Sequence, residues 1–92
     1  MSIHWLYDVI ESRRQNPTEQ SYTSSLFAAG LPKIAQKVGE EGTEVVVAAL
    51  AQDDQRLIEE VADLTYHTLV LLAARGLRME DILTELEKRH KQ

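Results

Sequence analysis

Two short runs of acidic residues have the spacing and the surroundings of a metal site. Glu40, Glu41 and Glu44 form the first run, and Glu60 and Asp63 form the second. Both runs lie in segments rich in Val, Leu and Ala, which are expected to pack against apolar neighbours. Burying carboxylates costs several kcal/mol per ion unless positive charge meets them. Acidic groups in such segments therefore indicate that they hold a cation.

The spacing of the first run turns it toward one edge of the predicted buried stripe of a helix. At about 100° per residue, two lysines and two glutamates fall within an arc of about 80° along this edge: Lys33, Lys37, Glu41 and Glu44. Glu40 lies next to the arc, nearer the solvent. Ile34, Val38, Val45 and Ala49 occupy the adjoining arc and are expected to be the apolar stripe itself.

The second run repeats this arrangement on another helix. Glu60, Asp63 and His67 share an arc of about 100° with Leu64 and Leu71. If the two helices pack antiparallel, the two acidic runs meet at one level. Hard divalent cations prefer such all-oxygen surroundings, and Mg²⁺ commonly combines carboxylates, waters and substrate phosphates.

The alternative for each single acidic residue is ordinary surface charge. Acidic side chains on helices are usually solvated or paired with Lys or Arg one turn away. Lys37 could pair with Glu41 in this way, and Glu44 could join a surface network with Lys33 and Lys37. Two runs with i,i+3 spacing, both beside an apolar stripe, favour the metal site over the solvated surface.

Helical periodicity dominates the chain, and strand alternation is nearly absent. Pro32 suits the first turn of a long helix that is expected to run to about Gln52. Asp53 or Asp54 can cap a second long helix, to about Arg75, which Gly76 then stops. The sequence therefore predicts an all-α fold, a small bundle of four to five helices with two long central ones.

Shorter elements flank the two long helices. Ser2 can cap a first helix that turns Ile3, Leu6 and Ile10 to one face. Residues 16–25 are expected to form a loop, and Thr23 to cap a short helix that ends at Gly30. A last helix is expected from about Met79 to near the C-terminus, although Arg78 is a poor N-cap, which Glu80 and Asp81 partly compensate through the helix dipole. Four of its apolar residues are expected to face inward: Met79, Ile82, Leu83 and Leu86.

Size and composition limit the class of protein. The 92 residues, 43% of them apolar, suffice for one domain over residues 1–92. A chain this short buries only roughly 60–65% of its unfolded surface, so a partner subunit is expected to complete the core. The chain has no cysteine, which excludes disulfides, thiolate zinc sites and cysteine nucleophiles.

Charge and hydropathy narrow the range of partners. The formal net charge is −5, and no basic stripe with interleaved aromatic residues is present, so we expect no binding of nucleic acid. The longest apolar stretch, residues 69–74, is far below the ~20 residues that span a bilayer. The N-terminus lacks the pattern of a signal peptide. The sequence therefore predicts a cytoplasmic protein without a membrane span.

Around the acidic runs, the sequence resembles the phosphoribosyl-ATP pyrophosphatase family. This family belongs to the all-α nucleoside-triphosphate pyrophosphatase group, which shares an E-E-x-x-E…E-x-x-D signature. The resemblance to the family itself rests on five segments: Ser-Tyr-Thr at 21–23, Ile-Ala-Gln-Lys-Val-Gly-Glu-Glu at 34–41, Ala-Asp-Leu at 62–64, Tyr-His at 66–67 and Glu-Leu-Glu-Lys-Arg at 85–89.

The resemblance implies an activity, a cofactor and an assembly. The reaction is the second step of histidine biosynthesis, the Mg²⁺-dependent hydrolysis of 1-(5-phosphoribosyl)-ATP to 1-(5-phosphoribosyl)-AMP and pyrophosphate. Members of the family are often homodimers whose helical bundle is completed by the partner. The substrate is a small nucleotide with a charge on the order of −6, so Mg²⁺ would also offset the repulsion between it and the acidic protein.

The resemblance also implies roles for particular residues. Four carboxylates would ligate Mg²⁺: Glu41, Glu44, Glu60 and Asp63. Glu40 joins Glu41 and Glu44 in the predicted catalytic set, where Glu40 would bind a second metal or orient water. Five residues would contact substrate: Lys33 and Lys37 at the phosphates, Tyr22 and Thr23 from the loop before the site, and His67, which could instead orient the Asp63 carboxylate.

Three other functions compete with this interpretation. One is a pyrophosphatase of the same group that acts on ordinary or damaged nucleoside triphosphates. Another is a ferritin-like di-metal protein, which would need two Glu-x-x-His motifs, whereas only residues 87–90 fit that pattern. The third is a non-catalytic helical dimerisation module with solvated acidic residues.

Overall fold

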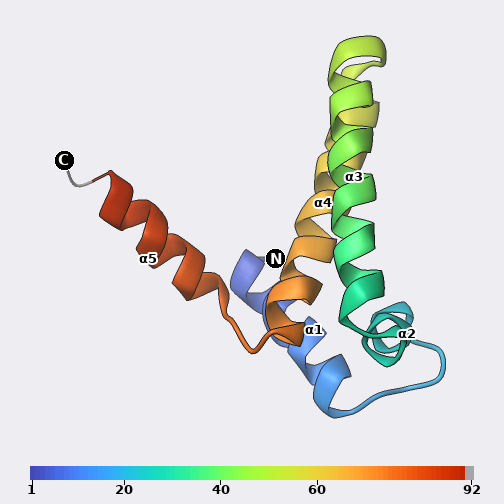
Figure 1. Cartoon of the computed structure of the whole chain (residues 1–92), viewed down its shortest axis with the longest axis vertical. Helices are drawn as coiled ribbons and strands as arrows, with labels where there is room; N and C mark the ends of the chain where they lie inside the picture. Colours follow the sequence, from blue (N-terminus) through green and yellow to red (C-terminus); the bar gives the residue numbers. More distant parts are fainter. Residues whose placement is uncertain (91–92) are drawn as a thin grey trace.

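The computed structural model of the chain describes residues 1–90, which form five α-helices and no strand (Figure 1). The helices are α1 (Ile3–Gln15), α2 (Tyr22–Ala29), α3 (Leu31–Ala51), α4 (Asp54–Ala74) and α5 (Met79–Arg89). The predicted all-α fold with two long central helices is confirmed. Lys91 and Gln92, at the end of the predicted 1–92 domain, lie outside the described residues.

The two long helices, α3 and α4, form an antiparallel hairpin (Figure 1). Gly30 has a φ of 97°, a conformation that glycine adopts readily, and Pro32 stands in the first turn of α3. Asp53 caps α4, where its side chain accepts a hydrogen bond of 2.9 Å from the backbone N–H of Arg56. These local signals set the starts of both helices, as the sequence predicted.

The N-terminal helices follow the prediction less closely. Ser2 caps α1 and accepts a hydrogen bond of 3.0 Å from the backbone N–H of Trp5. The expected loop over residues 16–25 is shorter, because α2 already begins at Tyr22. Ser21, and not Thr23, is its N-cap, with the Ser21 hydroxyl accepting from Ser24 N–H at 3.1 Å. The prediction of Thr23 as the cap was wrong, since Thr23 is the second residue of the helix and its side chain is buried in the protein.

The hydrophobic core lies where α1 and α2 pack against the start of α3 and the end of α4 (Figure 1). Its buried residues are Tyr7, Ile10, Leu26, Ile34, Leu69, Val70, Leu72 and Ala73. The other end of the hairpin leaves large apolar side chains exposed: Val46, Val47, Leu50, Ile58 and Val61. The core therefore fixes one end of the hairpin and leaves the other end open.

Helix α5 points away from the rest of the chain (Figure 1). It begins as predicted at Met79, and Asp81 compensates the poor cap directly, because its carboxylate accepts from the Arg78 backbone N–H at 2.8 Å. None of its residues is buried, however, and Ile82, Leu83 and Leu86 are 37%, 38% and 46% exposed. Met79 packs against the core as predicted, but the prediction that Ile82, Leu83 and Leu86 also face inward was wrong for the single chain.

No helix within residues 1–90 has both the length and the apolar composition needed to cross a membrane.

Candidate metal centre

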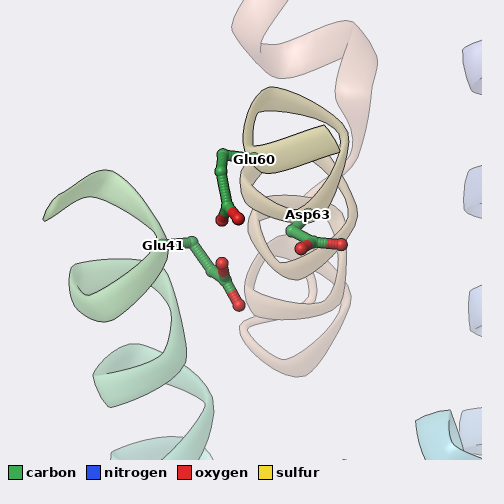
Figure 2. A group of neighbouring side chains, drawn as sticks. All are labelled: Glu41, Glu60 and Asp63. Carbon is green, nitrogen blue, oxygen red and sulfur yellow. The ribbon is translucent and has the colours of Figure 1, made fainter. Parts of the chain in front are cut away.

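Three acidic side chains from α3 and α4 converge between the two helices. Glu41 comes from α3, and Glu60 and Asp63 come from α4 (Figure 2). One carboxylate oxygen of each residue lies within 4.8 Å of the corresponding oxygens of the other two. The antiparallel packing of the hairpin thus brings both acidic runs to one level, as their spacing predicted.

Glu41 lies in the middle of the buried face of α3 rather than at its edge. The buried residues of this helix are Ile34, Glu41 and Ala48, which are seven residues apart. Ala49, which was expected in the apolar stripe, is exposed instead. The stripe is rotated because the apolar contacts of α4 decide which side of α3 is covered. Glu41 is consequently only 8% exposed, and its partner Glu60 only 5%.

The buried carboxylates have unused hydrogen-bonding capacity. Glu41 Oε2 and Glu60 Oε2 are both buried without a hydrogen-bond partner among residues 1–90. An unpaired buried carboxylate oxygen is costly, and a bound cation would remove that cost. The donor set consists of oxygen atoms. Hard cations such as Mg²⁺ prefer oxygen ligands, whereas softer transition metals prefer nitrogen and sulfur. The residues present therefore fit a divalent cation.

Glu44, the fourth predicted ligand, is not one of the three converging residues; it is exposed and lies next to Glu60. The pKa of Glu60 is raised above its ordinary value of 4.5, first because the neighbouring Glu44 carboxyl can form a hydrogen bond only with the protonated form of Glu60. Burial and the negative charges of Glu44 and Asp63 raise it further, and the Arg56 guanidinium opposes them. Excess negative charge therefore gathers at this site in the absence of a cation.

We expect Glu44→Gln to stabilise the metal-free protein at pH 7 and to leave its stability unchanged at pH 4. At pH values between 4.5, the ordinary pKa of Glu60, and its raised pKa in the native state, the native state binds more protons at Glu60 than the unfolded state does. The free energy of unfolding of the wild type therefore falls as pH rises through this window, and removing the Glu44 charge reduces that fall. Urea unfolding in EDTA at both pH values measures the effect, and equal stabilities at pH 7 would contradict it.

Other predicted site residues lie around this cluster. Glu40 faces solvent, as predicted, where its carboxylate accepts from Gln36 Nε2 at 3.2 Å and lies 3.9 Å from Lys37 Nζ. Lys37 is half-buried and Lys33 is exposed, both on the same helix as Glu41. The structure thus places Lys37 beside Glu40, and not in the surface pair with Glu41 that was the alternative to a metal site.

His67 is buried between the acidic cluster and α2. Its Nδ1 lies 2.9 Å from the backbone oxygen of Asp63, one turn earlier in α4, and 3.6 Å from Glu41 Oε1. The Nε2 atom lies 3.0 Å from the hydroxyl of Tyr22. Because Asp63 O can only accept, Nδ1 carries the proton in the neutral ring, and the Tyr22 hydroxyl then donates to Nε2. His67 therefore connects the start of α2 to the site.

A second contact between α2 and α4 runs beside the first. The hydroxyls of Thr23 and Tyr66 are hydrogen-bonded, and Thr23 is buried. The ring of Tyr22 stacks on that of Tyr66, with centroids 6.4 Å apart, yet Tyr22 remains 51% exposed. Of the predicted substrate contacts, Tyr22 thus offers an open aromatic surface, whereas the Thr23 hydroxyl is already engaged.

Sequence reasoning overlooked two residues of the site. Arg56 pairs with Glu60 at 2.7 Å, and Tyr66 holds both Thr23 and the Tyr22 ring. The i,i+4 spacing of Arg56 and Glu60 could have revealed the first, because it is the usual spacing of helical ion pairs. No comparable pattern pointed to the role of Tyr66.

Comparison with known proteins shows which family the chain belongs to. The family model for phosphoribosyl-ATP pyrophosphohydrolase matches residues 3–90. A phosphoribosyl-ATP pyrophosphatase of Lacticaseibacillus casei is 57% identical over 88 residues, 96% of this chain and 80% of the relative. One of Pyrobaculum calidifontis is 52% identical over 86 residues, 94% of this chain and 92% of the relative.

A two-function protein also matches the chain. The histidine biosynthesis bifunctional protein HisIE of Vibrio cholerae is 51% identical over 89 residues, which are 97% of this chain and 42% of the relative. The family model and these relatives cover nearly the whole length of the chain, including all four acidic residues at the junction of α3 and α4. The chain belongs to the phosphoribosyl-ATP pyrophosphohydrolase family.

Proposed function

We propose that this chain hydrolyses 1-(5-phosphoribosyl)-ATP to 1-(5-phosphoribosyl)-AMP and pyrophosphate, with Mg²⁺, as the second step of histidine biosynthesis in the cytoplasm. The observation that carries the proposal is the convergence of Glu41, Glu60 and Asp63, two of which are buried with an oxygen that has no partner among residues 1–90. Relatives that span most of the chain are named for this substrate and this pathway, which supports the assignment.

The acidic cluster would hold the metal through Glu41, Glu60, Asp63 and, from its exposed side, Glu44. When bound, Mg²⁺ would neutralise phosphate charge and lower the pKa of a coordinated water. Glu41 and Glu60 are fixed by burial, so they lose little freedom when they bind a ligand. Glu44 lies on the solvent side, where its carboxylate could accept a proton from the attacking water. We assign Glu40, farther along the same exposed side, a supporting role in orienting that water.

The α2 segment would meet the organic part of the substrate. The exposed ring of Tyr22 offers a stacking surface beside the cluster, and Tyr66 supports it from behind. His67 and Thr23 hold this surface in place through their hydrogen bonds to Tyr22 and Tyr66. We therefore propose that these residues bind the substrate partly by direct contact and partly by fixing the start of α2 against α4.

Lys33 and Lys37 would contact the phosphates. We expect Lys37→Ala to raise the Michaelis constant about fivefold with little change in kcat, because a half-buried cation contributes about 1 kcal/mol of binding to substrate and transition state alike. Steady-state kinetics at saturating Mg²⁺ measures this. Lys88→Ala, a charge change on the polar face of α5, is the control, and an unchanged Michaelis constant for Lys37→Ala would remove Lys37 from the phosphate site.

We further propose that the chain works as a homodimer. An isolated helix of 11 residues is marginal in water, yet none of the 11 residues of α5 is buried in the single chain. The exposed apolar residues of α5 and of the open end of the α3–α4 hairpin are a surface that a second copy would cover. This is the arrangement expected from a chain too short to bury a full core alone.

Release of pyrophosphate from phosphoribosyl-ATP, with and without Mg²⁺, tests the proposed function. Parallel turnover of dCTP identifies the main alternative, since a pyrophosphatase for ordinary nucleoside triphosphates would prefer it. Thermal unfolding with and without Mg²⁺ adds a test that needs no substrate. A melting temperature that Mg²⁺ leaves unchanged, together with no turnover, would favour a non-catalytic dimerisation module.

A further inference from the structure

Arg56 places a positive charge against the acidic cluster. It stands one turn before Glu60 on α4, and its Nη2 lies 2.7 Å from Glu60 Oε1. Its Nη1 lies 2.5 Å from Glu59 Oε1 on the outer face of the helix. The Arg56 side chain is 49% exposed, whereas that of Glu60 is only 7% exposed. The guanidinium thus reaches from the surface to one oxygen of a buried carboxylate.

This contact occupies only one of the two carboxylate oxygens of Glu60. Oε1 is occupied by Arg56, and Oε2 is buried without a partner among residues 1–90, on a carboxylate grouped with Glu41 and Asp63. A cation bound in the cluster would therefore share Glu60 with the guanidinium or displace it. Two positive charges a few ångströms apart repel each other, more strongly at a partly buried site than in water.

The geometry also allows Arg56 to give up this contact. Arginine presents five N–H donors in a planar fork, and Arg56 contacts Glu59 through Nη1 and Glu60 through Nη2, so the two contacts use different donor atoms. A cavity of ≈ 290 Å³ lies beside it, lined by Glu44, Val47, Gln52, Arg56 and Glu60, and gives the side chain room to move. The pair is therefore exchangeable, unlike an ion pair enclosed in a core.

We propose that Arg56 is a resident counter-cation that offsets the charge of Glu60 in the metal-free protein and weakens the binding of a divalent cation by the cluster. The inference rests on the proposed metal centre. Its consequence is that the cluster binds the metal firmly only when substrate phosphates add further oxygen ligands and negative charge. Arg56 would then favour a metal that arrives with the nucleotide over one held permanently.

Titration of the metal-free protein with Mg²⁺ alone, followed by calorimetry, tests this role. Removing the competing charge in Arg56→Ala is expected to lower the dissociation constant about fivefold, the larger effect seen for single ion pairs. Arg56→Gln keeps much of the side-chain shape without its charge and should show the same change. The matched control is Arg89→Ala, which removes an i,i+4 pair with Glu85 at 3.0 Å, far from the cluster, and should bind Mg²⁺ like the wild type.

The melting temperature without Mg²⁺ provides a second measurement. Arg56→Ala is expected to melt below the wild type in EDTA, because Glu60 loses its counter-charge, and the difference should shrink at saturating Mg²⁺. Equal or weaker Mg²⁺ binding by both Arg56 variants, with binding by the wild type intact, would overturn the role of Arg56 alone. Absence of Mg²⁺ binding in all four proteins would overturn this inference, and turnover that does not depend on Mg²⁺ would overturn the proposed metal centre as well.

Discussion

Asp63→Asn is expected to lower pyrophosphate release from phosphoribosyl-ATP by a factor of about 10³ without disturbing the fold. A metal bound at the cluster would supply several kcal/mol of charge stabilisation, and each 1.36 kcal/mol is about tenfold in rate. Asparagine has nearly the shape of aspartate but lacks its charge. Asp63 is exposed, so the exchange leaves no cavity in the core. Turnover at saturating Mg²⁺ and far-ultraviolet circular dichroism measure the two halves of this prediction.

Glu59→Gln is the matched control for this loss. Glu59 lies on the same helix, one residue before Glu60, and its side chain contacts Arg56 at the surface rather than the cluster. Its replacement by Gln removes the same unit of charge as Asp63→Asn. It should keep near-normal turnover. If Asp63→Asn did so as well, Asp63 would not be a ligand. If both variants lost activity together, the general charge of α4 would be responsible rather than a specific metal site.

The two long helices were predictable because their start signals are local. Asp53 needs only its own side chain and the N–H of Arg56 to cap α4, and Gly30 needs only its own backbone freedom to precede α3. The start of α2 was missed because Ser21 and Thr23 are both acceptable caps by type. Burial of Thr23 against Tyr66 decided between them, and that contact joins residues 43 positions apart.

Three of the four predicted metal ligands come together in the structure, and their exact geometry was less predictable. Helical spacing showed that Glu41, Glu60 and Asp63 could share one level, and the structure places them together. The exact rotation of α3 was not predicted. The side of α3 that becomes buried depends on the apolar residues of α4 as well as on those of α3. The contact of Arg56 with Glu60 was not predicted, because the expected positive charges were the lysines of α3, whereas Arg56 lies in the preceding turn of α4.

The periodicity of α5 predicted an inward apolar face, whereas most of that face is exposed in the single chain. The spacing of Ile82, Leu83 and Leu86 correctly indicates an apolar stripe. A sequence does not specify whether such a stripe is covered by its own chain or by a second copy. The exposed stripe leads to the second large effect that we expect.

Leu86→Glu is expected to raise the dissociation constant of the homodimer about a thousandfold. In a two-fold symmetric dimer each copy loses its own buried leucine, about 2 kcal/mol each, so the total is about 4 kcal/mol. The control is Thr84→Glu, which adds the same charge on the opposite face of α5 and should leave the dimer intact. Sedimentation of the wild type and both variants over a range of concentrations measures the constants.

The outcomes of this experiment show whether the apolar face of α5 lies in a dimer interface. A wild-type dimer that only Leu86→Glu dissociates would show that the apolar face of α5 lies in the interface. A dimer that survives Leu86→Glu would place the interface elsewhere, with the exposed end of the α3–α4 hairpin as the next candidate, where Leu50 is 84% exposed. A wild type that sediments as a monomer throughout would contradict the proposed dimer itself. Because α5 contributes no buried residue to the single chain, loss of the dimer need not unfold the monomer, and circular dichroism of Leu86→Glu should still report α1 to α4 as helical.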